Sequence, residues 1–193
     1  MIRDDRGASL VELLAVLALA GILAGLSAPL SANALDTGRV RSAASFLSAR
    51  FRLARIEAVN RSANVGVVFD QRHGGWELRA CRDGNGNGLR RSEIAAGADP
   101  CFDGPHDFGA MFPGVDIAVD PQLVGPAGEP GNPDPVRLGT PDIASFSATG
   151  ACTPGSVFLR STRGQQFAIR IAGANGRLRM FRYDAGPRTW LQL

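Results

Sequence analysis

The sequence predicts an α+β fold in which one long N-terminal helix precedes a β-rich domain of antiparallel strands. Two observations lead to this prediction. Residues 8–30 form an almost uninterrupted apolar run, whereas the chain beyond Asn60 consists of short apolar segments separated by glycine and proline. No helical segments alternate with these later stretches, and a parallel sheet requires such crossover helices, so antiparallel pairing is expected.

The apolar run begins directly after a short polar segment, residues 1–7. From Ala8 to Leu30 every residue is Leu, Val, Ile, Ala, Gly or Pro, apart from Ser9, Glu12 and Ser27. A helix of this length extends about 34 Å, which is enough to cross the hydrocarbon core of a bilayer. We therefore expect a transmembrane helix with a single carboxylate near its start.

That carboxylate, Glu12, needs a compensating partner, because a charge at the centre of a membrane helix costs roughly 2.5–3.5 kcal/mol. Cleavage after Gly7 would create an α-amino group on Ala8, one helical turn from Glu12, and this amine could pair with the Glu12 of a neighbouring subunit. In a secretory signal the cleavage site follows a shorter apolar region. Here the helix would stay on the mature protein. An uncleaved signal anchor with a chance carboxylate is the alternative.

The segment Arg6-Gly7-Ala8-Ser9-Leu10-Val11-Glu12 resembles the class III leader of type IV prepilins and type II secretion pseudopilins. In those proteins glycine precedes the cleavage site, phenylalanine usually follows it, and glutamate stands at the fifth mature position. The resemblance implies that a prepilin peptidase cleaves between Gly7 and Ala8 and N-methylates Ala8. It also implies that Glu12 guides subunit assembly. Ala8 departs from the usual phenylalanine.

The helix is expected to kink beyond Pro29 and to continue to Arg61. At 100° per residue one narrow apolar face forms, consisting of Val40, Ala44, Leu47, Phe51, Ala54 and Ala58. Arginines flank this face on both sides: Arg39, Arg41, Arg50, Arg52, Arg55 and Arg61. We interpret them as side chains that extend around a docked helix rather than as one nucleic-acid stripe. The predicted organisation is a leader (1–7), a transmembrane and assembly helix (8–30), a periplasmic part of the helix (31–61) and a globular domain (62–193).

The globular domain is predicted to begin with a hairpin, in which strands 64–70 and 76–81 are joined by the turn His73-Gly74-Gly75. Further strands are expected over residues 115–119, 136–138, 143–147, 156–160, 166–172 and 177–182. The domain is therefore predicted to be all-β.

Two segments resemble the GspH/FimT family of type II secretion minor pseudopilins and type IV minor pilins. Leu53-Ala54-Arg55-Ile56-Glu57-Ala58, followed by a strand, resembles the end of that family's long helix. Phe146-Ser147-Ala148-Thr149-Gly150 resembles its Phe-x-Pro-x-Gly turn, with Ala148 in place of proline. The resemblance extends from Gly7 to about Arg182. It implies a pilin-like fold, with the long helix packed on an antiparallel β-sandwich.

Charge is distributed unevenly along the domain. Residues 83–142 hold ten acidic residues against three arginines, whereas residues 160–193 hold seven arginines and one aspartate. All 21 basic residues of the chain are arginine, and guanidinium groups are well suited to phosphates.

Within this basic segment, Gly176-Arg177-Leu178-Arg179 resembles the DNA-binding motif of FimT-type minor pilins that act in natural transformation. The resemblance implies that Arg177 and Arg179 are the principal DNA contacts, with Arg182 and Arg188 as weaker candidates. A strand whose outward arginines are simply solvated is the alternative.

The three cysteines allow at most one internal disulfide. Cys81 and Cys101 would close a short loop across a segment rich in glycine, asparagine and aspartate, which leaves Cys152 free, buried or intermolecular. Within this loop, Asp83, Asn85 and Asn87 match the start of an EF-hand calcium loop. Ile94 occupies the position of the required acidic ligand, so we prefer an Asn/Gly turn and expect no bound metal.

No catalytic arrangement is evident, since His73 and His106 lie in loops without nucleophile or metal-ligand spacing. We expect a non-enzymatic protein without a cofactor, held in the inner membrane by a single span, with its C-terminal domain in the periplasm. Its expected partners are other pilins or pseudopilins, prepilin peptidase and membrane lipid. The first hypothesis is a GspH-like minor pseudopilin of a type II secretion pseudopilus. The alternatives are a FimT-like minor pilin that binds DNA and a free-standing, membrane-anchored binding protein.

Overall fold

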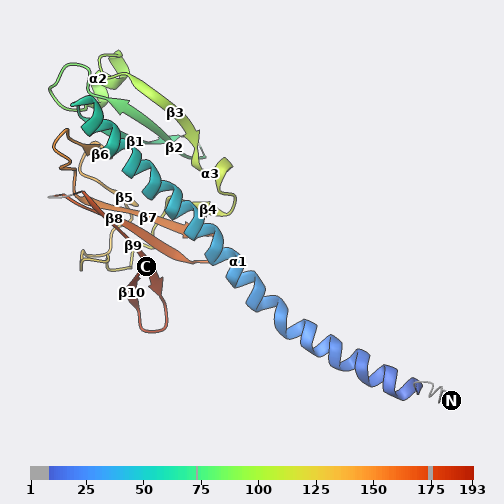
Figure 1. The fold of residues 1–193 in the computed structure, drawn as a ribbon. Coiled ribbons are helices and arrows are strands. Elements are labelled where there is room, and N and C mark those ends of the chain that lie inside the picture. Colours follow the sequence, from blue (N-terminus) through green and yellow to red (C-terminus); the bar gives the residue numbers. More distant parts are fainter. Residues whose placement is uncertain (1–8, 73, 174–175) are drawn as a thin grey trace, which may run out of the picture. The chain divides into compact units, whose positions relative to one another are not determined.

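The computed structural model of the chain describes residues 9–72, 74–173 and 176–193, except for the side chains of residues 23–32. The chain divides into two compact units, Met1–Asp36 and Thr37–Leu193. The second unit contains both β-sheets and forms the globular domain (Figure 1).

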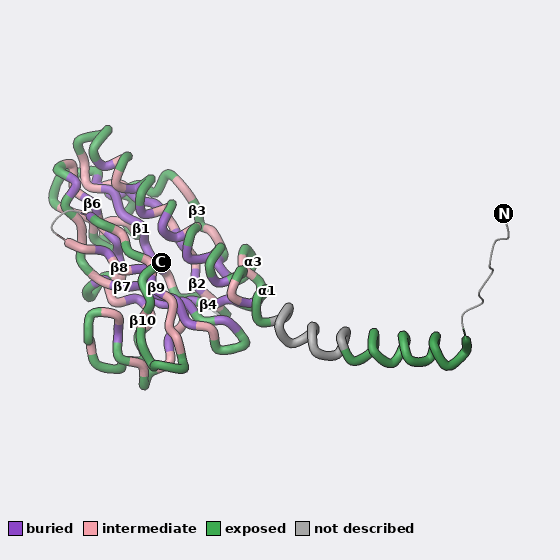
Figure 2. The backbone as a smooth tube through the Cα atoms, turned by 60° about the horizontal axis from the view of Figure 1, so that its bottom comes forward, coloured by how far each residue is buried: buried purple, intermediate pink, exposed green. Residues whose placement is uncertain are grey.

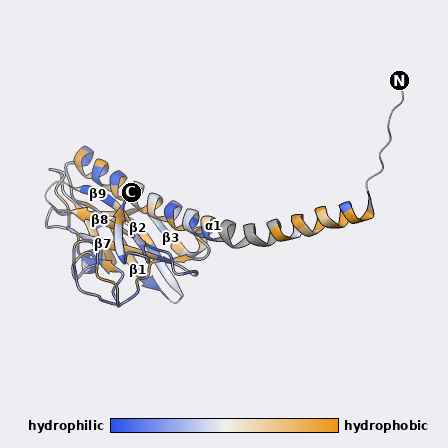
Figure 3. Cartoon of the chain, turned by 90° about the horizontal axis from the view of Figure 1, so that it is seen from below, coloured by the Kyte–Doolittle hydropathy of each residue, from blue (hydrophilic) through white to orange (hydrophobic). Residues whose placement is uncertain are grey.

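Helix α1 (Leu10–Arg61) is assigned without a break through Pro29. Glu12 in its first turn and Arg61 in its last turn both have the sign of charge that the helix dipole favours. From Ser9 to Ile22 every residue is exposed, including Leu10 (75%) and Val11 (72%), and this stretch has the strongly hydrophobic colour in Figure 3. Over the residues that the structure describes, no helix meets the combined requirement of length and apolar character for a membrane span.

The later turns of α1 present one apolar face to the domain. All six residues predicted for this face are buried, and the prediction is confirmed: Val40, Ala44, Leu47, Phe51, Ala54 and Ala58 are at most 4% exposed. Figure 2 shows the resulting alternation of buried and exposed residues along this part of the helix. The spacing of three and four residues places them on one side.

One antiparallel sheet has the strand order β3-β2-β1-β6. Its strands are β1 (Val65–Arg72), β2 (Gly75–Arg82), β3 (Cys101–Asp107) and β6 (Ile143–Phe146). The two paired strands of the predicted hairpin are confirmed, since β1 and β2 pair from Val65↔Arg82 to Arg72↔Gly75. His73 of the predicted turn lies outside the described residues. Strand β3 was not predicted. It is mostly exposed and contains Gly104 and Pro105, so no apolar alternation marks it.

The second antiparallel sheet has the order β10-β9-β8-β7-β4, with β5 also paired to β7. Its strands are β4 (Val115–Asp116), β5 (Val136–Arg137), β7 (Gly155–Ser161), β8 (Gln166–Ala172), β9 (Arg177–Asp184) and β10 (Thr189–Gln192). The prediction for residues 115–119 was too long, because only the first two residues pair with β7. Strand β10 was missed, since its short sequence is largely exposed.

Two short helices correct the expectation of an all-β domain. Helix α2 (Arg91–Ala96) ends at Gly97, whose φ of 80° lies in the left-handed region that glycine favours. Helix α3 (Phe108–Met111) is capped at its N-terminus by Asp107, whose side chain accepts the backbone N–H of Ala110 at 3.0 Å. Both helices lie in segments too short to show helical periodicity.

The main core joins α1 to both sheets. The ring of Phe51 on α1 lies 6.1 Å from that of Phe69 on β1 and 6.3 Å from that of Phe146 on β6, measured between centroids. Leu159 on β7 and Ile169 on β8 belong to the same buried cluster. The fold is thus α+β, with an N-terminal helix packed on antiparallel sheets, as the sequence predicts.

Candidate functional site

The N-terminal candidate residues are only partly within the described chain. Gly7 and Ala8, the predicted cleavage and methylation positions, lie outside the described residues. Glu12 is exposed in the first turn of α1, and its backbone N–H donates to the Ser9 carbonyl at 3.0 Å. Glu12 is therefore the one predicted assembly residue whose surroundings the structure describes.

The arginine motif lies at the start of β9. Arg177 and Arg179 are both exposed and share one face of the strand, because alternate residues of a strand point to the same side. Leu178 and Met180, on the opposite face, pack against the main core. This packing fixes the strand and holds the two arginines at the surface.

Strand pairing adds a third arginine beside the motif. Arg179 lies directly opposite Arg170 of β8, an unfavourable arrangement for like charges. The Arg170 guanidinium donates to the Glu129 carboxylate at 2.6 Å, and this ion pair compensates one of the two charges.

Helix α1 supplies arginines next to β9. A groove of about 250 Å³ is bordered by both elements. Its lining consists of Arg41, Ser45, Ser48, Arg52, Arg177, Leu178, Arg179, Met180, Gln192 and Leu193. The structure thus brings Arg177 and Arg179 to the same groove as Arg41 and Arg52, but Arg182 and Arg188 are not part of its lining.

The sequence pattern favours a packing role for Arg41 and Arg52, as side chains that extend around a docked helix, and not a place in a nucleic-acid stripe. Their spacing in the sequence is a pattern from which their common position on α1 could have been predicted. Residues 41, 45, 48 and 52 recur at intervals of three and four, so they form one polar stripe beside the apolar face of α1.

Gly150 and Gly176 belong to the two segments that resemble family motifs, and both lie close to the Arg55 side chain of α1. A Cβ atom on Gly176, whose φ is 61°, would lie 3.0 Å from the Gly150 carbonyl oxygen and 3.2 Å from the Arg55 Nε atom. A Cβ on Gly150, whose φ is 80°, would lie 3.2 Å from an Arg55 Nη atom. Both positions combine a left-handed backbone with close packing, so glycine is needed at each. The glycine that precedes Arg177 therefore has a structural role.

The free thiol of Cys152 lies at this junction. Its S–H donates to the Ala172 carbonyl at 3.2 Å, and the side chain is half-buried. Burial raises the pKa of the Cys152 thiol, although the Gly176 N–H and the Arg55 charge act in the opposite direction. The thiol is thus mainly protonated at neutral pH and acts as a small packed side chain.

A disulfide joins Cys81 on β2 to Cys101 on β3. The loop that it closes is organised by the Asp83 carboxylate, which accepts the backbone N–H groups of Gly86 at 2.7 Å and Gly88 at 2.8 Å and the Asn64 amide at 2.8 Å. Burial disfavours the charged carboxylate, but these hydrogen bonds outweigh it and hold the pKa of Asp83 below its usual range.

The other two candidate calcium ligands of this loop also have partners within the protein. The side-chain amides of Asn85 and Asn87 donate to the Glu93 carboxylate at 3.1 and 2.8 Å. A set of three or more His, Cys, Asp or Glu side chains placed to hold a metal ion is not found over the described ranges. The geometry is that of a self-contained Asn/Gly turn.

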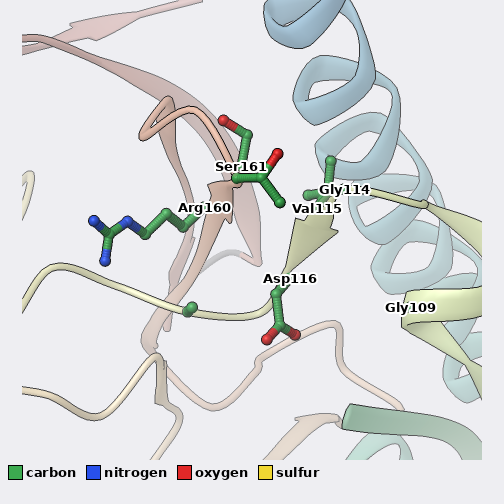
Figure 4. A pocket seen from close by; sticks show the side chains of 8 residues that line it. Gly109, Gly114, Val115, Asp116, Arg160 and Ser161 are labelled. Carbon is green, nitrogen blue, oxygen red and sulfur yellow. The ribbon is translucent and has the colours of Figure 1, made fainter. Parts of the chain in front are cut away.

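A hollow beside β4 and β7 offers no catalytic arrangement. It has a volume of about 440 Å³, and Figure 4 shows the Arg160 guanidinium and the Asp116 carboxylate extending in different directions. The Ser161 hydroxyl accepts the N–H groups of Arg163 and Gln165 at 3.2 and 3.0 Å, so it stabilises a turn. His106 lies elsewhere, 3.0 Å from Asp103.

A long helix packed on an antiparallel β domain, with an exposed apolar N-terminal portion, defines a pilin-like subunit. Residues 43–176 match the model of the family described as type II transport protein GspH. This match covers more than half of the chain, and the chain belongs to the GspH family. The family is one of structural pilin-type subunits that assemble with other pilins in a filament, and it is not a family of enzymes.

A curated relative supports the same class. The pilin-like protein PilA1 of Thermus thermophilus is 42% identical over 82 residues, which are 42% of this chain and 51% of the relative. The match therefore spans about half the length of that protein. No solved structure matches the chain significantly.

Proposed function

We propose that this protein is a minor pseudopilin, a structural subunit of a type II protein secretion pseudopilus. The observation that carries the proposal is the apolar start of α1, which is exposed on all sides from Ser9 to Ile22 and holds a single carboxylate. Exposed apolar surface on this scale favours burial in lipid or against other helices. A prepilin peptidase would cleave after Gly7 and methylate Ala8, and the helix would anchor the subunit in the inner membrane before assembly.

In this proposal Glu12 selects the position of the subunit in the filament. A carboxylate among apolar helices is costly unless it has a partner of opposite charge. The α-amino group of Ala8 on a neighbouring subunit is the partner that cleavage would create. Pairing would fix the axial register between the two helices, since only one offset brings the two charges together.

Replacing Glu12 by glutamine is expected to reduce incorporation into the filament about tenfold. The substitution keeps the shape and removes the charge, and the loss of a charge-assisted hydrogen bond worth roughly 1.5 kcal/mol corresponds to that factor. The measurement is the amount of subunit in sheared filaments, determined by immunoblot in cells that produce the complete set of pilins.

Glu57→Gln is the matched control, because Glu57 also lies on α1 but pairs with Arg61 at the protein surface. Surface pairs of this kind contribute little, so this variant should assemble normally. Incorporation of Glu12→Gln at the wild-type level would contradict the proposed role of Glu12.

The second candidate function is that of a FimT-like type IV minor pilin that binds DNA. The observation that favours it is the groove between α1 and β9, in which Arg177 and Arg179 lie beside two further arginines. Clustered arginines provide the sequence-independent part of DNA binding, because they neutralise phosphates and release counterions.

If DNA is bound here, Arg177→Ala/Arg179→Ala should weaken binding and should reduce the slope of log K against log salt by about two. Fluorescence anisotropy with a labelled duplex, using the full chain in non-ionic detergent, measures both quantities. Arg61→Ala/Arg72→Ala removes the same charge from two surface arginines that pair with Glu57 and Glu77. An equal effect of this control, or no binding by the wild type, would exclude the DNA-receptor function.

A further inference from the structure

We infer that α1 forms one wall of a nucleic-acid groove, in which Arg41 and Arg52 bind the DNA phosphodiester backbone together with Arg177 and Arg179, without contacts to the bases. The inference rests on the second candidate function above and extends it. The four arginines line a single groove although they come from opposite ends of the domain sequence.

The helix arginines are spaced for an extended polyanion. Arg41 and Arg52 are eleven residues apart on one stripe of α1, which corresponds to about 16 Å along the helix axis. One DNA strand advances about 3.4 Å per nucleotide. The helix wall therefore spans roughly five nucleotides, whereas Arg177 and Arg179, about 6.6 Å apart on their strand, span about two.

Two other arginines of α1 have carboxylate partners that neutralise their charge. Arg50 pairs with Asp103, and Arg61 pairs with Glu57. In contrast, Arg41, Arg52 and Arg179 form no ion pair with a carboxylate side chain among residues 9–72, 74–173 and 176–193. No aspartate or glutamate is among the lining residues. The side chains that line the groove therefore carry concentrated positive charge, which a phosphate backbone neutralises.

The neutral lining residues indicate how the ligand is recognised. Ser45, Ser48 and Gln192 provide hydrogen-bonding groups that suit phosphate oxygens. The lining contains no aromatic side chain on which an unstacked base could lie, and such stacking platforms are the usual means of holding single-stranded bases. Binding through phosphates alone does not depend on base sequence.

The test compares Arg41→Ala/Arg52→Ala with the wild type by fluorescence anisotropy, using the full chain in non-ionic detergent and two duplexes of unrelated sequence. We expect at least a tenfold loss of affinity for both duplexes and a decrease of about two in the salt slope. Arg41→Lys/Arg52→Lys keeps the charge and should retain most of the salt slope. Circular dichroism and thermal unfolding establish that each variant is folded.

The outcomes separate this inference from the function on which it rests. If Arg177→Ala/Arg179→Ala weakens binding but Arg41→Ala/Arg52→Ala behaves like the Arg61→Ala/Arg72→Ala control, the helix wall is excluded and the DNA-receptor function stands. If the wild type does not bind DNA, both are excluded. If the affinity of the wild type differs strongly between the two duplexes, the absence of base contacts is excluded.

Discussion

Replacing Phe51 by alanine is expected to lower the free energy of unfolding by about 3–5 kcal/mol. Phe51 is fully buried, and its ring contacts those of Phe69 and Phe146. Removing it takes apolar surface out of the core and leaves a cavity between α1 and the first sheet, which cannot close without moving the helix. Urea denaturation of the full chain in detergent, followed by tryptophan fluorescence, measures the change.

Phe102→Ala is the matched control for this prediction. It removes the same side chain from β3, where Phe102 is 51% exposed. Half of its surface is already in contact with water, so the expected loss is below about 1 kcal/mol. A similar loss for the two variants would mean that the helix is not held to the domain by this aromatic cluster.

Replacing both Cys81 and Cys101 by alanine is expected to lower the free energy of unfolding by about 3 kcal/mol. The disulfide joins residues separated by 20 positions, and closing a loop of that length reduces the conformational entropy of the unfolded chain by about this amount. Denaturation in the presence and absence of a reductant measures it, because reduction should destabilise the wild type and leave the double variant unchanged.

Cys152→Ala provides the control for the thiol chemistry. Cys152 is a free, half-buried cysteine, so its removal should leave the sensitivity to reductant intact. A wild-type protein whose stability does not change on reduction would contradict the stabilising role of the disulfide.

The parts of the fold that the sequence could predict are those with a regular apolar pattern. The buried face of α1 follows from the recurrence of Val40, Ala44, Leu47 and Phe51 at helical spacing, and the first hairpin follows from two apolar segments around a Gly-Gly turn. Strands β3 and β10 have no such pattern, because most of their residues are exposed and their position depends on pairing with β2 and β9.

Only those parts of the candidate site that are close together in the sequence could be predicted. The segment from Gly176 to Arg179 is visible as a motif, and Arg177 and Arg179 do lie on one face of β9. The contribution of Arg41 and Arg52 depends on how β9 packs beside α1, across more than one hundred residues of intervening sequence. A pattern of neighbouring residues cannot reveal a contact between segments that are so far apart in the sequence. The cleavage position and the role of Glu12 stay predictions.

The contact of Arg55 with Gly150 and Gly176 has a mechanical consequence. Any movement of this part of α1 relative to the β domain has to be accommodated by the side chains that lie between them. Arg55 lies so close to both turns that a Cβ atom at either glycine would come within 3.2 Å of its guanidinium group. A shift of this part of α1 would therefore press on the turn that precedes β9, so the position of the arginines that follow Gly176 depends on the position of the helix.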